Sequence, residues 1–166
     1  MNEPIADGLF ALALHESAHM VAAVALGCKP IRVAIIAAGH GQAGATNFRI
    51  PPEDETRDFT EGIIAAAAEM AEHRMYGANV PDKHTAPRDI GVEPLVPDSK
   101  LISDARFLAG MSAYHRGAAY GIAAQIVDEH WVRILALAEE LARVGSITES
   151  VHLQGIRHWW TQQTQE

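Results

Sequence analysis

Residues 4–26 form an almost unbroken apolar segment that carries two histidines four positions apart. The spacing of its apolar residues predicts a helix with a broad apolar surface, and Gly27 followed by Pro30 is a typical stop signal. Positions four apart lie on one face of a helix, so the imidazoles of His15 and His19 can reach a single metal ion. This segment therefore predicts both a helix and a candidate metal site on that helix.

The two histidines belong to the HExxH motif His15-Glu16-Ser17-Ala18-His19. In such a motif the glutamate lies beside the metal and can take a proton from the attacking water. Two histidines without partners would be costly inside an apolar run, which favours metal binding. A catalytic zinc needs a third protein ligand, and the residues alone leave several carboxylates open for it: Glu69, Glu72, Asp89, Asp98 and Asp104.

The rest of the chain predicts a mainly α fold with a small β element, in a single domain spanning residues 1–166. Short strands are expected at 31–37 and 45–50, on either side of a Gly-rich turn. Helices are expected at 59–76, from about Ser103 to Tyr114, from Gly117 to Arg143, and from Thr148 through Trp160, with a Pro-containing loop at 78–97.

Composition narrows the function classes. The net charge of −8 argues against nucleic-acid binding, which needs a basic surface. A single cysteine, Cys28, excludes an intrachain disulfide and a Cys-based zinc site. No basic residue precedes Lys29, so no secretory signal is expected, and no stretch reaches the about 20 apolar residues of a membrane span. We therefore expect a cytoplasmic protein without a membrane span.

Between about residues 12 and 156, the order of motifs resembles the peptidase domain of FtsH-type ATP-dependent zinc proteases. The HESAH motif is similar to that family's HEAGH. Pro30–Ile36 resembles its first strand, and Gly44-Ala45-Thr46 is similar to its G-x-T pattern. Ser103–Ala109 looks like the family helix whose aspartate is the third zinc ligand.

The resemblance implies a zincin-like peptidase that hydrolyses peptide bonds, with Zn²⁺ held by His15, His19 and Asp104 and with Glu16 as general base. It moves Glu72 to a supporting role. It also implies that an edge strand over 31–37, with Val33, Ile35 and Ile36, binds the peptide by β-augmentation. The two histidines and a carboxylate suit zinc best, although iron, cobalt and nickel accept the same donors.

The sequence also departs from the family pattern. Ala18 stands where HEAGH has glycine, Ala37-Ala38 replaces a Pro-Arg pair, and there is no P-loop or ATPase module. We therefore expect a stand-alone, ATP-independent metallopeptidase that acts on peptides or unfolded chains. A homo-oligomer or a separate ATPase partner is compatible with this. The alternatives are a zinc-binding adaptor or regulator without turnover, and a metal-free helical interaction protein.

Overall fold

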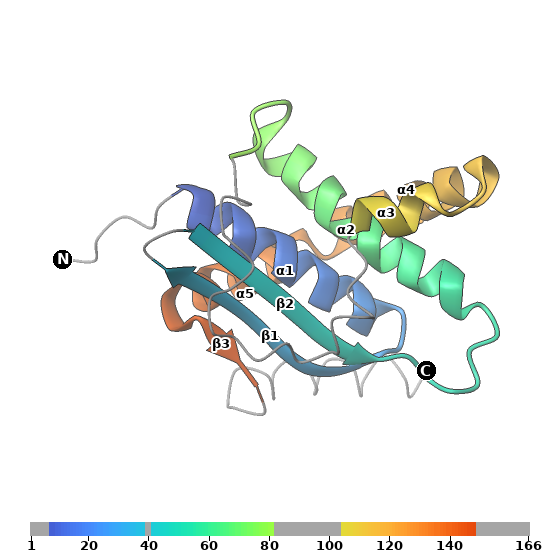
Figure 1. The fold of residues 1–166 in the computed structure, drawn as a ribbon, viewed down its shortest axis with the longest axis horizontal. Helices are drawn as coiled ribbons and strands as arrows, with labels where there is room; N and C mark the ends of the chain where they lie inside the picture. The colour runs from blue at the N-terminus through green and yellow to red at the C-terminus, as the bar shows by residue number, and fades with distance from the viewer. Residues whose placement is uncertain (1–6, 39–40, 82–103, 149–166) are drawn as a thin grey trace.

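A computed structural model describes residues 7–38, 41–81 and 104–148 of the chain (Figure 1). Within these ranges the elements follow the order α1 (Asp7–Ala25), β1 (Lys29–Ala38), β2 (Gly41–Arg49), α2 (Arg57–Tyr76), α3 (Asp104–Ala109), α4 (Ala113–Glu129), α5 (Trp131–Val144) and β3 (Ser146–Ile147). The described part of the chain is thus mainly helical with one small sheet, which confirms the predicted fold class at that level.

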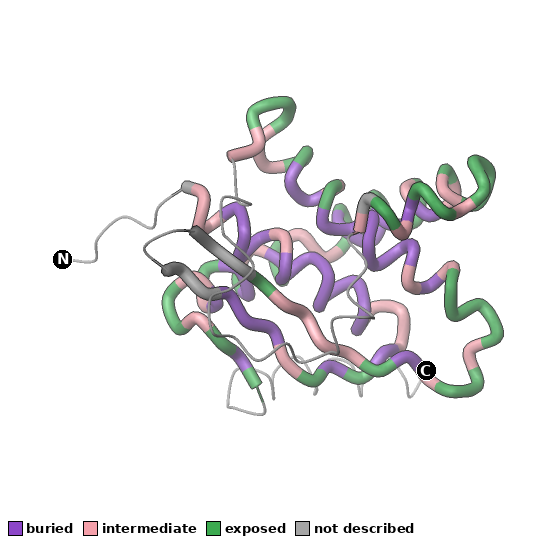
Figure 2. The backbone as a smooth tube through the Cα atoms, in the orientation of Figure 1, coloured by how far each residue is buried: buried purple, intermediate pink, exposed green. Residues whose placement is uncertain are grey.

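Helix α1 lies at the centre of the molecule, between the sheet on one side and α2 on the other, and it also packs against α5 (Figure 1). Figure 2 shows it buried over most of its length. Its leucines, valines and alanines make up much of the core; Leu14 and Met20, for example, are fully buried. An all-round apolar helix is the expected occupant of such a position.

By length and composition, α1 could also cross a membrane. Its window Gly8–Ala25 has a mean hydropathy of 1.3, but 72% of that window is buried inside the fold. A core helix passes the same test, so the expectation of no membrane span stays a prediction.

The three strands form an antiparallel sheet in the order β2-β1-β3. The expectation that the strand at 31–37 is an edge strand is therefore wrong. Strand β1, which carries Val33, Ile35 and Ile36, is the central one, because β3 pairs with Val33 and Ala34. In addition, the Ile35 N–H donates to the Gly145 carbonyl at 2.7 Å. Val33 is fully buried.

The later helices differ from the expected boundaries. The helix predicted from Ser103 to Tyr114 ends at Ala109, and α4 begins after Ser112, whose hydroxyl accepts from the His115 N–H. The amphipathic stretch predicted up to Arg143 is two helices that meet at His130. The helix predicted from Thr148 through Trp160 and the loop predicted at 78–97 lie largely outside the described residues.

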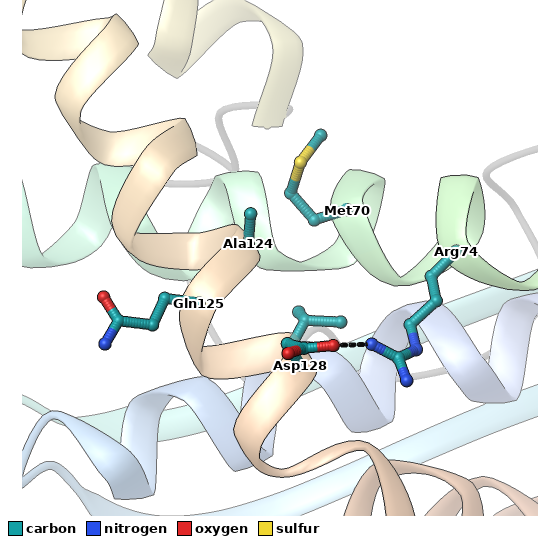
Figure 3. Close-up of a pocket in the computed structure, with 6 residues that line it drawn as sticks. Met70, Arg74, Ala124, Gln125 and Asp128 are labelled. Carbon is teal, nitrogen blue, oxygen red and sulfur yellow. Dashed lines mark hydrogen bonds and ion pairs between the residues drawn. The ribbon is translucent and has the colours of Figure 1, made fainter.

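Helices α2, α4 and α5 are tied together by Arg74 of α2. Its guanidinium forms an ion pair with Asp128 of α4 (Figure 3) and lies 4.7 Å from the ring centre of Trp131 in α5. A surface pocket lies beside this pair, between α2 and α4, lined by Met70, Arg74, Ala124, Gln125, Val127 and Asp128. Among the described residues, none of the predicted metal ligands lines this pocket.

Candidate metal centre

Three predicted ligand side chains converge on one point. His15 and His19 lie one helical turn apart on α1, and Asp104 is the first residue of α3. The Nε2 atoms of the two histidines are 3.1 Å apart, and Asp104 Oδ2 lies 3.0 Å from each of them. A separation of 85 residues along the chain between His19 and Asp104 is thus closed by the packing of α3 against α2, which itself packs against α1.

The other ring nitrogen of each histidine has a partner on α2. His19 Nδ1 donates to the Ile64 carbonyl oxygen at 2.8 Å, and His15 Nδ1 donates to the Glu72 carboxylate. A carbonyl and a carboxylate only accept, so both Nδ1 atoms carry the proton. A neutral ring in this orientation carries its lone pair on Nε2, which is the tautomer that metal-ligating histidines require, whereas a protonated ring donates from Nε2 to Asp104.

The electrostatics of the cluster favour a cation. Burial disfavours charge on His15, but hydrogen bonds to Asp104 and Glu72 outweigh it and raise its pKa to about 9. Burial also opposes charge on His19, whose pKa the Asp104 carboxylate nevertheless raises. Burial acts to raise the pKa of Asp104, yet the two imidazoles hold it well below its usual range. Three converging donor atoms thus hold a positive charge between them.

The donors fit zinc by number, chemistry and spacing. Zinc binds histidine nitrogen and carboxylate oxygen at about 2.0–2.1 Å, which places tetrahedral donors about 3.3 Å apart. The observed separations of 3.0–3.1 Å are close to that value. The Asp104 side chain is 38% exposed, so the cluster can be reached from solvent. His15, His19 and Asp104 could therefore hold the metal and leave a coordination position open.

Glu16 lies next to this cluster and is itself buried, with 7% of its surface exposed. Its charge acts on both His15 and His19, where it favours the protonated rings. On its other side Glu16 meets β2: the Thr46 hydroxyl donates to Glu16 Oε2 at 2.6 Å. A carboxylate held beside a candidate metal site in this way is placed to accept and return a proton.

The other carboxylates predicted as possible third metal ligands either have other contacts or lie outside the described residues. Glu72 contacts His15 Nδ1, which is the ring nitrogen turned away from the three converging atoms. The Glu69 carboxylate accepts from the Tyr120 hydroxyl at 2.5 Å. Asp89 and Asp98 lie outside the described residues. Among the described residues, His15, His19 and Asp104 are the group that brings donor atoms within metal-binding distance.

Sequence reasoning missed the contacts that orient these side chains. The Ile64 carbonyl is a backbone atom, which no residue pattern reveals. The contact of Thr46 with Glu16 spans 30 residues and joins a helix to a strand. In the sequence, Gly44 and Thr46 belong to the G-x-T pattern, and that pattern is the one signal that points to them.

In comparisons with known protein families and with curated proteins, no family model and no curated protein matches this chain.

Proposed function

We propose that this chain is a zinc-dependent peptidase of the zincin type, in which His15, His19 and Asp104 hold the metal. The observation that carries the proposal is the convergence of two histidine Nε2 atoms and one carboxylate oxygen beside the buried Glu16. The sequence motifs that resemble those of FtsH-type peptidase domains agree with this proposal.

Zinc bound by these residues supplies a Lewis acid that polarises the scissile carbonyl and makes water more acidic. Glu16 accepts a proton from the attacking water and then delivers it to the leaving amine. Ile64 and Glu72 keep both imidazoles in the ligating tautomer throughout. The substrate is a peptide or an unfolded segment, because a folded chain would not bring its backbone into contact with the cluster without an unfolding partner.

The first test measures zinc content and peptide cleavage on the full chain. We expect one zinc per chain in the parent and in Glu16→Gln, because Glu16 is not a ligand. Cleavage of a mixture of peptides of diverse sequence, followed by mass spectrometry, should fall by about 10²–10⁴-fold in Glu16→Gln. Asp104→Ala should lose both zinc and cleavage.

Asp128→Ala is the matched control, since it removes an exposed carboxylate that pairs with Arg74 away from the cluster. It should keep both zinc and cleavage. If the zinc-loaded parent and Glu16→Gln cleave the mixture equally poorly, the chain is not a peptidase, and a zinc-binding adaptor or regulator becomes the better description. If the parent takes up no metal, the zinc proposal itself fails.

A further inference from the structure

We infer that Gly44 and Thr46 of β2 position the general base, so that this strand is part of the catalytic apparatus without touching the metal. This inference rests on the proposed function, because it assigns the residues that act through Glu16. Residues two apart on a strand face the same side, and here that side faces α1. Gly44 and Thr46 contact the same side chain from that face.

Thr46 holds one oxygen of the base. Its hydroxyl donates to Glu16 Oε2 at 2.6 Å, a distance typical of a hydrogen bond to an ionised carboxylate. The same hydroxyl oxygen lies 3.0 Å from the Glu16 backbone carbonyl. A hydroxyl has one proton, so the carboxylate, as the charged acceptor, is its stronger partner. This bond fixes the orientation of the carboxylate, which keeps lone pairs for exchanging a proton with water and with the leaving amine.

Gly44 makes room for that carboxylate. A methyl group added at Gly44 would lie 2.7 Å from both Cγ and Oε1 of Glu16, which is closer than such atoms can approach. The backbone at Gly44 has no positive φ, so glycine is needed here for space and not for backbone conformation. Glu16 is thus held between a hydrogen bond from Thr46 and a close backbone contact at Gly44.

Thr46→Val keeps the shape of the side chain and removes the hydrogen bond. In the zinc-loaded full chain we expect kcat for peptide cleavage to fall by about 10- to 100-fold, with KM and zinc content unchanged. Thr46→Ser restores the hydroxyl and should recover most of kcat. Gly44→Ala should lower kcat by displacing Glu16. Thr46→Val added to Glu16→Gln should cause little further loss, because both changes act on the same group.

Two control variants make the same chemical changes elsewhere. Thr60→Val removes a hydroxyl that donates to Asp54 at 2.8 Å, and Gly121→Ala adds a methyl group where no atom lies within 4 Å. Both should keep the parental kcat. Parental kcat in Thr46→Val, no rescue by Thr46→Ser, or full additivity with Glu16→Gln would overturn the inference.

Crystal structures of the parent and of Thr46→Val separate this inference from the proposed function. If the parent has no peptidase activity, the proposed function fails, and the position of Glu16 still tests the role of Thr46. We expect Glu16 to leave its observed place, or to occupy several, in Thr46→Val. A Glu16 side chain that stays in place without the hydroxyl would overturn the inference whether or not the protein cleaves peptides.

Discussion

The two histidines of the candidate centre are oriented by partners of different charge. His19 Nδ1 donates to a neutral backbone carbonyl, whereas His15 Nδ1 donates to the buried Glu72 carboxylate, 6% exposed. A carboxylate behind an imidazole both fixes its orientation and increases its basicity as a ligand. Glu72 should therefore contribute to metal affinity although its oxygens are not among the converging donor atoms.

Glu72→Ala tests this role directly. We expect zinc affinity to fall by about 10- to 100-fold, because His15 loses the group that fixes its tautomer and ring orientation. Competition with a coloured zinc chelator measures the change. Glu69→Ala is the control, since Glu69 lies one turn earlier on α2 and its carboxylate contacts Tyr120. Equal zinc affinities in Glu72→Ala and in the parent would contradict this role of Glu72. Loss of zinc in Glu69→Ala would instead indicate that Glu69 is a ligand.

The predictability of these residues follows from their separation along the chain. His15, Glu16 and His19 could be predicted because a helix brings positions four apart together by its own geometry. Asp104 could be singled out among the candidate carboxylates only through the resemblance, since no local rule links it to His19 across 85 residues. The contacts of Ile64 and Thr46 depend on how α2 and β2 pack against α1, which the residue pattern does not specify.

At the scale of elements, the turn after α5 joins a helix to the sheet. Gly145 ends α5 in a left-handed conformation, with φ of 79°, and its N–H donates to the Leu141 carbonyl at 2.8 Å. Its own carbonyl accepts from the Ile35 N–H of β1. The turn then leads directly into β3, so Gly145 fixes the position of the strand that covers the edge of β1.

Gly145→Ala should destabilise the fold. A side chain at this φ costs about 1–2 kcal/mol of unfolding free energy, even though the nearest atom, the Ile35 oxygen, would lie 3.6 Å away. Urea denaturation followed by circular dichroism measures the loss. Gly117→Ala in α4 is the matched change, because there the added methyl group meets no atom within 4 Å and alanine is the better helix former. It should stabilise by about 0.5–1 kcal/mol. If both substitutions changed the free energy of unfolding in the same direction, the left-handed φ of Gly145 would not explain the effect.

This turn also shows why some elements could be predicted from the sequence and others could not. Helices α1 and α2 have apolar residues at helical spacings over many positions, and their presence, like that of the two long strands, is predicted correctly. Strand β3 has two residues and exists because Ser146 and Ile147 pair with β1 more than a hundred residues earlier. No glycine or proline lies between Ile122 and Val144, on either side of the break at His130, so the periodicity gives no reason to end a helix there.

At the scale of the whole molecule, the candidate centre brings α3 to the central helix α1, with which α3 has few other contacts. Its donors come from α1 and α3, and α2 orients both histidines. Helix α3 has six residues, and most of its contacts are with α2. A metal bound to Asp104 would therefore fasten this short helix to the central helix of the core and stabilise the folded chain.

Zinc removal should consequently lower the melting temperature. A ligand that binds only the folded state at 1,000 times its Kd adds about 4 kcal/mol of stability, which corresponds to roughly 10 °C for a chain of this size. Differential scanning calorimetry with excess zinc and with a chelator measures this increment. Asp104→Ala should lose most of it, whereas Asp128→Ala should keep it in full, because that carboxylate pairs with Arg74 on the surface. The comparison uses the zinc-dependent increment alone, so any effect of either substitution on the metal-free fold cancels. An undiminished increment in Asp104→Ala would mean that α3 does not hold the metal and that the third ligand lies elsewhere in the chain.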